Sequence, residues 1–293
     1  MRRLLAFVLA ALIGVFPPAV TPALAQEGVG FFGGAGTATT PSYTRQVLNL
    51  NAGAGTQLSS GGSAHTLGSF VSLGTASTDL AGFNLGLTNA SGSGRYQIQL
   101  SLNSDGSSPF FSDFFFQPSV SSLNLNVPVP IGIATGSTIY GAIRSNSGSP
   151  ASINAQISGW VGTPAKFTAV DNVTTPNTGG TAPGGSATVT TSDTTFTTLN
   201  PTTSNAYKAI LVTWATTAGP AAGQMVTFRF AKGGSGSEVV IGSVPYAISG
   251  SAVNNGRGFA LFEADIPAGE RISVNALGAT GGDTILFGVM GFR

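Results

Sequence analysis

Residues 225–231 read M-V-T-F-R-F-A, an alternation that places Val226, Phe228 and Phe230 on one side of an extended strand. Thr227 falls on the opposite side. Alternation with a period of two predicts a half-buried β-strand, whereas an amphipathic helix would repeat with a period near 3.6. The pattern of this stretch therefore indicates a sheet with one apolar and one polar face.

Similar short strands recur along the rest of the chain. The sequence contains 42 glycines and 16 prolines, which interrupt almost every window long enough for a helix. About seven or eight strands are expected in each half of the chain. In the second half they include residues 207–215, 272–276 and 284–292. The spacing predicts an all-β fold of two tandem antiparallel, jelly-roll-like β-sandwiches, and it leaves no room for the crossover helices of a parallel α/β fold.

The two halves of the sequence resemble each other, segment by segment and in the same order. The offset between matched segments drifts between 123 and 133 residues, as small loop insertions would produce, so an internal duplication is predicted. The matched segments are 61–64 with 184–187, 70–73 with 196–199, 96–102 with 226–232, 106–107 with 236–237, 133–139 with 266–272, and 157–160 with 289–292.

This duplication and the composition of the intervening segments divide the chain into five parts. A linker is predicted because the stretch that ends at Gly185 is rich in Pro, Gly and Thr and lacks apolar periodicity. The predicted parts are a signal peptide at 1–25, a flexible Gly/Thr-rich lead-in at 26–47, the first sandwich at 48–163, the linker at 164–185, and the second sandwich at 186–293.

The first 25 residues have the pattern of a secretory signal. Arg2 and Arg3 precede a short apolar run, and the A-L-A at 23–25 predicts cleavage before Gln26. The run is shorter than the roughly 20 residues that span a bilayer. The mature chain is therefore expected to be secreted or at the cell surface, with the periplasm as an alternative, and to have no membrane span.

Charged residues are scarce, at 8% of the sequence against about 25% in a typical protein. Removal of the signal peptide leaves 10 basic and 11 acidic residues, a net charge of −1. Without a basic patch, a nucleic-acid partner is not expected. The chain has no cysteine and one histidine, which excludes Cys–His nucleophiles and His-rich zinc sites, so no metal or cofactor is predicted.

A family resemblance enters with two segments of the second half. G-S-G-S-E-V-V-I at 234–241, followed by I-P-A-G-E-R-I at 266–272, resembles a β-sandwich module of tailed-phage virion-associated proteins. Those proteins are mostly of uncharacterised function. The resemblance covers mainly residues 206–292 and implies the type of module.

Few residues could carry acid–base or metal chemistry. His65 lies in G-G-S-A-H-T-L without a nucleophile elbow, which argues against a catalytic triad. Glu263 and Asp265 share one strand face, where a solvated surface is a simpler interpretation than a glycosidase pair. Residues 103–106 hold some ligands of a calcium loop but lack the later ones, which favours an Asp-Gly turn. The chain is therefore predicted not to be an enzyme.

Two charged residues of the second copy are absent from the first. Glu238 and Arg271 align with Ser108 and Thr138. We expect Glu238 and Arg271 to form a structural ion pair that joins two segments of the second sandwich.

Carbohydrate recognition by a β-sandwich generally uses an exposed aromatic ring beside amide and carboxylate groups. The candidates are Trp160, Trp214 and Tyr140. Trp214 is in phase with Ile210 and Val212, which predicts that it faces the core, and the position of Trp160 on a final strand suggests the same.

The segment 109–118, P-F-F-S-D-F-F-F-Q-P, allows two interpretations. It is either a strand buried on both faces or an apolar patch for self-association or partner docking. Consecutive phenylalanines on a strand point to opposite faces, so some rings should emerge or meet the second module. The candidate interface consists of Phe110, Phe111, Phe114, Phe115 and Phe116.

Together these features predict an exported, non-enzymatic surface, structural or adhesion module. It would act through contacts with an unknown protein or glycan, or by self-assembly into a homo-oligomer. The alternative is a carbohydrate-binding β-sandwich, which predicts an exposed Trp or Tyr in a shallow groove. An outer-membrane barrel ranks third, because the linker and the duplication argue against it.

Overall fold

The described part of the chain is built from β-strands. The computed structural model describes residues 46–51, 53–92, 94–107, 109–116, 124–161, 165–174, 185–216, 223–248 and 258–293, all within one unit of residues 39–293. The strand pairs in these ranges are antiparallel, which confirms the predicted all-β fold. No helix in these ranges is long and apolar enough to cross a membrane. The predicted signal peptide and residues 26–45 of the lead-in lie outside the described residues.

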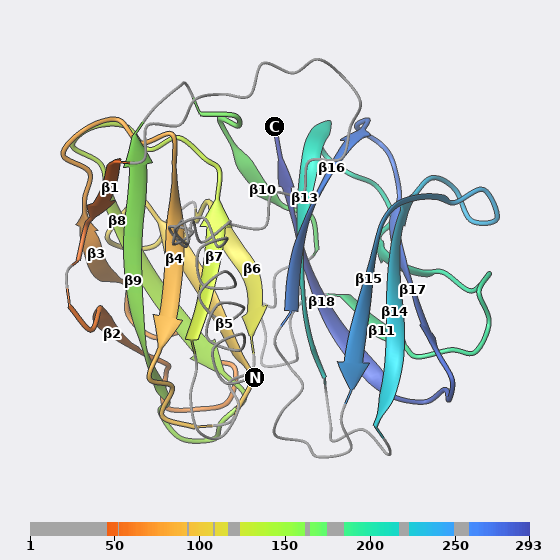
Figure 1. Ribbon diagram of the computed structural model, residues 1–293. Helices are drawn as coiled ribbons and strands as arrows, with labels where there is room; N and C mark the ends of the chain where they lie inside the picture. The colour runs from red at the N-terminus through yellow and green to blue at the C-terminus, as the bar shows by residue number, and fades with distance from the viewer. Residues whose placement is uncertain are drawn as a thin grey trace, which may run out of the picture. The chain divides into compact units, whose positions relative to one another are not determined.

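The first sandwich consists of two sheets (Figure 1). One has the strand order β1 (Gln46–Asn49), β9 (Ser152–Val161), β4 (Gly82–Thr88) and β7 (Asn124–Val129), and β2 (Thr56–Ser59) also pairs with β9. The other has the order β3 (Val71–Thr75), β8 (Thr138–Ser145), β5 (Tyr96–Ser101) and β6 (Phe111–Phe116).

The second sandwich repeats this arrangement strand for strand. Its first sheet has the order β10 (Val170–Asn172), β18 (Thr284–Phe292), β13 (Tyr207–Thr216) and β16 (Gly258–Ile266), and β11 (Gly185–Thr188) also pairs with β18. Its second sheet has the order β12 (Thr197–Asn200), β17 (Ile272–Gly278), β14 (Gln224–Lys232) and β15 (Val239–Ile248). Adding nine to each strand number of the first sandwich gives the second, as expected for an internal duplication.

Alternation along the strands fills the two cores. On β14, Val226, Phe228 and Phe230 are all fully buried in the second core. Along β9, half-buried and buried side chains alternate from Ser152 to Gly159. The period-two pattern of the sequence is therefore the pattern of burial.

In the first sheet of the second sandwich, the central strands β13 and β18 are buried on both faces. Their alternate residues belong to two different apolar clusters. One set lies in the core of the second sandwich: Ile210, Val212, Trp214, Phe287 and Val289. The other set joins the cluster of the first sandwich: Ala209, Leu211, Met290 and Phe292.

The first sandwich meets this sheet through its edge strand β6, which contacts β10, β13 and β18 (Figure 1). Phe111, Phe114 and Phe116 are fully buried in the first core. Phe115 points the opposite way and is only 3% exposed, and its backbone N–H donates to Thr213 Oγ1 at 3.1 Å. Both faces of β6 are therefore covered within the chain.

This packing agrees with the first of the two interpretations of the Phe-rich segment, a strand buried on both faces that meets the second sandwich. Four of its five candidate interface residues are buried, and Phe110 is partly buried against the first core, where its ring meets Phe83 edge-on at 6.3 Å. The rings form no exposed patch for a partner. Instead, the segment is the contact between the two sandwiches, because β6 is the strand nearest the outer face of β13 and β18.

Part of the segment predicted as a linker is also packed. Val170–Asn172 form β10, which pairs with the end of β18. Phe167 is buried and its ring lies 5.3 Å from that of Phe292. Thr174 Oγ1 accepts a hydrogen bond from the backbone of Val289. Residues 165–174 therefore belong to the folded structure, and residues 175–184 lie outside the described residues.

Since Phe115 contributes to the contact between the sandwiches, Phe115→Ala tests whether they unfold together. Removing a buried phenylalanine ring should lower the free energy of unfolding by roughly 3–5 kcal/mol. Calorimetry should show one transition that moves as a whole to lower temperature. Met225→Ala, at a side chain 61% exposed, is the control and should leave the transition in place. Two separate transitions, with only one shifted by the Phe115 change, would show that the sandwiches unfold independently.

Glu238 and Arg271 form an ion pair between two turns of the second sandwich. Arg271 Nη1 lies 2.8 Å from Glu238 Oε1, and their side chains are 13% and 11% exposed. Arg271 also donates from Nε to Thr198 Oγ1 at 2.8 Å and from Nη2 to the carbonyl oxygen of Phe196 at 3.2 Å. The guanidinium thus joins the β14–β15 turn to the segment that leads into β12.

Arg271→Ala should lower the Tm more than Lys208→Ala, because the Lys208–Asp265 pair is far more exposed. The pKa of Glu238 is lowered, chiefly by the hydrogen bond from Arg271. The pair should therefore stabilise the fold fully above the unfolded-state pKa of about 4.3, and less as the pH falls through the lower folded-state pKa. Thermal melts from pH 7 to pH 3 should show a smaller Tm difference between the wild type and Arg271→Ala at the acid end, where only the hydrogen bonds of Arg271 to neutral acceptors remain. A pH-independent gap would contradict this.

Candidate functional site

An open, shallow groove of about 650 Å³ lies beside two turns of the first sandwich. One wall is the turn between β5 and β6, the other is the turn between β7 and β8, and Tyr140 reaches the groove from β8. Its lining is mostly uncharged and polar: Leu102, Asn103, Ser104, Asp105, Ser107, Gly136, Ser137, Thr138 and Tyr140.

The β5–β6 wall is held by its own side chains. Asn103 Nδ2 donates to the carbonyl oxygen and to Oγ of Ser107, at 3.0 and 3.1 Å. Ser107 N–H donates to Asp105 Oδ1 at 2.9 Å, and hydrogen bonds from Ser107, first from its backbone, lower the pKa of Asp105. Gly106 adopts φ +73°, and a Cβ there would lie 2.0 Å from the ring of Phe70. The wall is therefore ordered before any ligand arrives.

The β7–β8 wall is anchored in the same way from outside the groove. Asp79 Oδ1 accepts hydrogen bonds from the backbone N–H of Thr135 at 2.7 Å and from its Oγ1 at 2.8 Å. The backbone bond is the larger cause of the lowered pKa of Asp79. At the base of the wall, Thr138 Oγ1 and Thr75 Oγ1 lie 2.7 Å apart.

The second sandwich has the same two turns but closes the space between them. Gly106 and Gly136 correspond to Gly236 and Gly269, and all four have φ between +73° and +86°. In the second sandwich, the Glu238–Arg271 ion pair reaches from the β14–β15 turn to the start of β17. In the first, Thr138 stands in the place of Arg271, and the space between the turns is the groove.

The register of the strands shows that the groove also differs at its aromatic residue. Tyr140 is paired with Ser72 and Ser101, and the residue with the equivalent pairing in the second sandwich is Ser273. Ser273 is fully buried, whereas Tyr140 is half-buried and lines the groove. The aromatic side chain is thus a feature of the first copy only.

The other two aromatic candidates are placed elsewhere. Trp214 is buried in the second core, where its ring packs edge-on against Phe228 and Tyr246. Trp160 is half-buried near the end of β9, against Gly82, where a Cβ would lie 2.3 Å from its ring. Of the three sugar-platform candidates, only Tyr140 therefore lines the groove.

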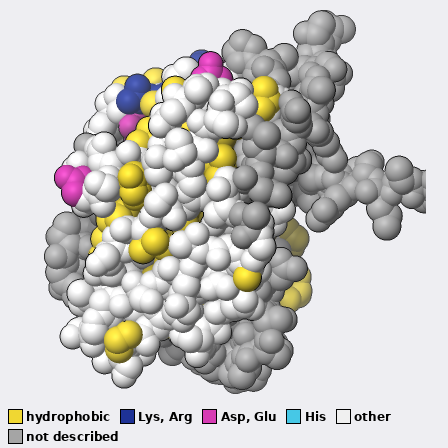
Figure 2. All heavy atoms as spheres, turned by 90° about the vertical axis from the view of Figure 1, so that its left-hand side faces the viewer, with side chains coloured by type: hydrophobic (Ala, Val, Ile, Leu, Met, Phe, Trp, Pro, Cys, Tyr) yellow, Lys and Arg dark blue, Asp and Glu magenta, His cyan; other side chains and the backbone are white. Residues whose placement is uncertain are grey.

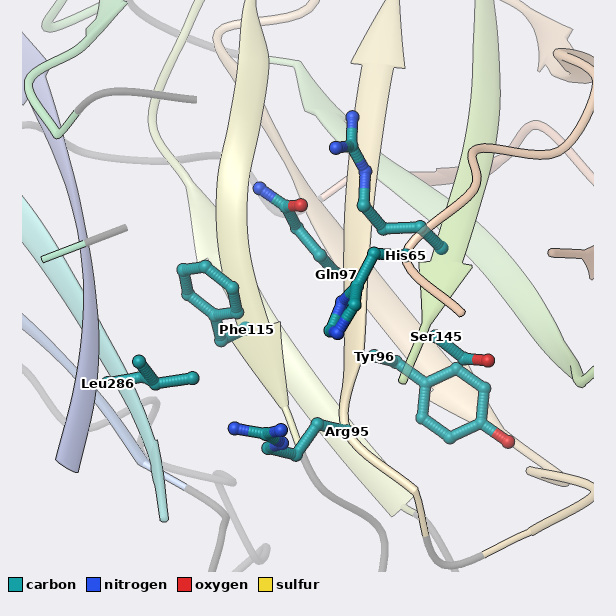
Figure 3. A pocket seen from close by; sticks show the side chains of 8 residues that line it. His65, Arg95, Tyr96, Gln97, Phe115, Ser145 and Leu286 are labelled. Carbon is teal, nitrogen blue, oxygen red and sulfur yellow. The ribbon is translucent and has the colours of Figure 1, made fainter. Parts of the chain in front are cut away.

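A second, much smaller pocket lies where the two sandwiches meet. It was not foreseen from the sequence, because its arginines are 49 positions apart and become neighbours only through the β5–β8 pairing. In Figure 3, the His65 ring lies between Gln97 and Arg95, with Phe115 and Leu286 to one side. Its lining comprises His65, Arg95, Tyr96, Gln97, Phe115, Arg144, Ser145 and Leu286.

The carboxylates considered for catalysis are paired with lysines at the surface. Glu263 contacts Lys166, and Asp265 lies 2.6 Å from Lys208 Nζ. Each carboxylate therefore has its own cation, and the two do not form an isolated acid–base pair. Among the described residues, no cluster of three or more His, Asp or Glu side chains could hold a metal ion.

Comparison with known proteins gives structural likenesses without sequence relatives. No protein-family model and no curated protein matches the chain. PNGase F, a glycosylasparaginase from Flavobacterium meningosepticum, is 10% identical, covers 85% of this chain and 96% of its own, and has a TM-score of 0.44. The viral capsid protein STIV MCP is 12% identical over 84% of this chain and 95% of its own, with a TM-score of 0.36. PBSX exported protein XepA is 12% identical, covers 84% of this chain and 86% of its own, and has a TM-score of 0.21.

These likenesses concern the fold alone. The expected resemblance to phage virion modules is supported only as a weak structural similarity to a viral capsid protein and to XepA, and no family model adds evidence from the sequence. The prediction of a non-enzymatic module is contradicted by the matches to PNGase F, which is an enzyme.

Proposed function

We propose that this chain binds carbohydrate in the groove beside Tyr140. The observation that carries the proposal is the difference between the two sandwiches at one structural position. In the second, the space between the two turns is bridged by the Glu238–Arg271 ion pair. In the first, the same space is open and lined by Tyr140 together with amide, hydroxyl and carboxylate groups.

The chemistry of the lining suits a sugar. A tyrosine ring offers an apolar face to the C–H groups of a pyranose ring, and its hydroxyl can take part in hydrogen bonds. Asn103 and Asp105 supply the amide and carboxylate groups that sugar hydroxyls can pair with, and the serines and Thr138 add groups that both donate and accept. The volume of the groove lies within the range of about 300–1,000 Å³ usual for small-ligand sites.

The rigidity of both walls favours binding. The hydrogen bonds around Ser107 and Thr135 are made within the protein, so a ligand need not order these turns on arrival. Binding then avoids much of the entropy loss that accompanies the ordering of a loop. Export, which the N-terminal pattern predicts, would bring the groove to extracellular glycans.

Tyr140→Ala tests this proposal on a glycan array with the tag-free mature chain. It should weaken binding of the recognised glycan at least about tenfold, because the ring supplies the stacking surface. Asp105→Asn should weaken binding as well, through loss of the charged acceptor, and the far-UV spectrum of both variants should be unchanged.

The matched control is Trp160→Ala, which removes the other partly exposed candidate ring. Binding that survives Tyr140→Ala but is lost in Trp160→Ala would move the sugar site to β9. Absence of binding to any glycan on the array by the wild-type chain would overturn the proposed function.

A further inference from the structure

The small pocket between the sandwiches gathers positively charged and hydrogen-bond-donating groups from separate parts of the chain. His65 comes from the segment between β2 and β3, Arg95 immediately precedes β5, and Arg144 lies on β8. Gln97 completes the polar side, while Phe115 of β6 and Leu286 of β18 form an apolar side (Figure 3). Among the described residues, no carboxylate lines this pocket.

One nitrogen of the Arg95 guanidinium lacks a hydrogen-bond acceptor in this pocket. Its Nη1 atom is buried from solvent and makes no hydrogen bond to any described group. A buried charged donor without an acceptor is expensive, so such an atom in a folded protein calls for a ligand or an ion. Partial burial also lowers the pKa of Arg95, because it removes part of the guanidinium from water.

His65 lines the same pocket, and its backbone is constrained. Its φ is +61°, a left-handed conformation that non-glycine residues adopt at a cost, and its N–H donates to the carbonyl oxygen of Ser145 at 2.6 Å. Burial, and then the charges of Arg95 and Arg144, lower the pKa of His65. The imidazole therefore lies in a positive electrostatic potential, and a bound anion would offset that potential.

We propose that this pocket binds one oxyanion group, a carboxylate, sulfate or phosphate, with Arg95 and His65 as its principal donors. The enclosed space is about 10 Å³, room for one oxygen atom of the group, so the remainder of the ligand lies at the mouth. The apolar side formed by Phe115 and Leu286 excludes water from one flank and strengthens the charge interaction. This anion site is separate from the groove beside Tyr140 and does not depend on the proposed function.

The single histidine of the chain makes the site measurable. The imidazole resonances of His65 would be followed by NMR against pH in the tag-free mature protein, at one fixed ionic strength. The salts are sodium chloride as reference and sodium acetate, sulfate or phosphate. A bound oxyanion should raise the pKa of His65 by about one pH unit relative to chloride. The acetate, sulfate and phosphate arms separate a carboxylate site from a sulfate or phosphate site.

Arg95→Gln should abolish the anion-dependent change of the His65 pKa, while Arg229→Gln should preserve it. Arg229 is the matched control because it lies in the second sandwich, hydrogen-bonded to Asn275. The proposal is overturned if all four salts give the same His65 titration in the wild type, or if Arg95→Gln keeps the full response. The wild-type titration alone decides the matter if Arg95→Gln does not fold.

Discussion

The packing of β6 against β13 and β18 is the constraint on which the rest of the structure depends. It buries an edge strand of one sandwich against the outer face of a sheet of the other, so both faces of β13 and β18 are apolar. Solubility then depends on the remaining outer surfaces. Figure 2 shows one of them, with few charged side chains and with apolar ones scattered among uncharged polar groups and backbone. Hydroxyl and amide side chains, which far outnumber the charged ones in the sequence, hydrate these faces.

The fold could be predicted from the sequence because the alternation of apolar and polar residues follows burial directly, as on β14. The contact between the two sandwiches could not be predicted in this way. Consecutive apolar residues, as in 207–215 and 284–292, are the pattern of a strand buried on both faces, but they do not say what covers the second face. Two predictions from local composition are wrong. The Gly/Pro/Thr-rich segment predicted as a linker includes the strand β10, and the Gly/Ser-based match of 61–64 with 184–187 is not the structural correspondence. Gly185 lies opposite Phe287, as Thr56 lies opposite Ala155, so 184–187 corresponds to 55–58.

The site was partly predictable. Tyr140 could be named as a candidate ring, and the alignment of the copies showed that the first lacks Glu238 and Arg271. The sequence did not show that the space left by these two residues is a groove. The walls of the groove are turns from distant parts of the sequence, so only the structure brings them together. In a chain with so few charged residues, the position of a single ion pair has a clear structural effect. The space between the two turns is bridged by an ion pair in the second sandwich and is open in the first.

The double burial of β13 and β18 also bears on how the chain comes to be folded. Strand β6 precedes β18 by about 170 residues, so the first sandwich is complete in sequence long before its covering sheet exists. Until then, an edge strand with an outward-facing Phe115 is available to any other chain that offers a strand or an apolar face. The interval between the emergence of the two halves is thus the period of greatest aggregation risk, and a slow or interrupted delivery of the C-terminal half would lengthen it.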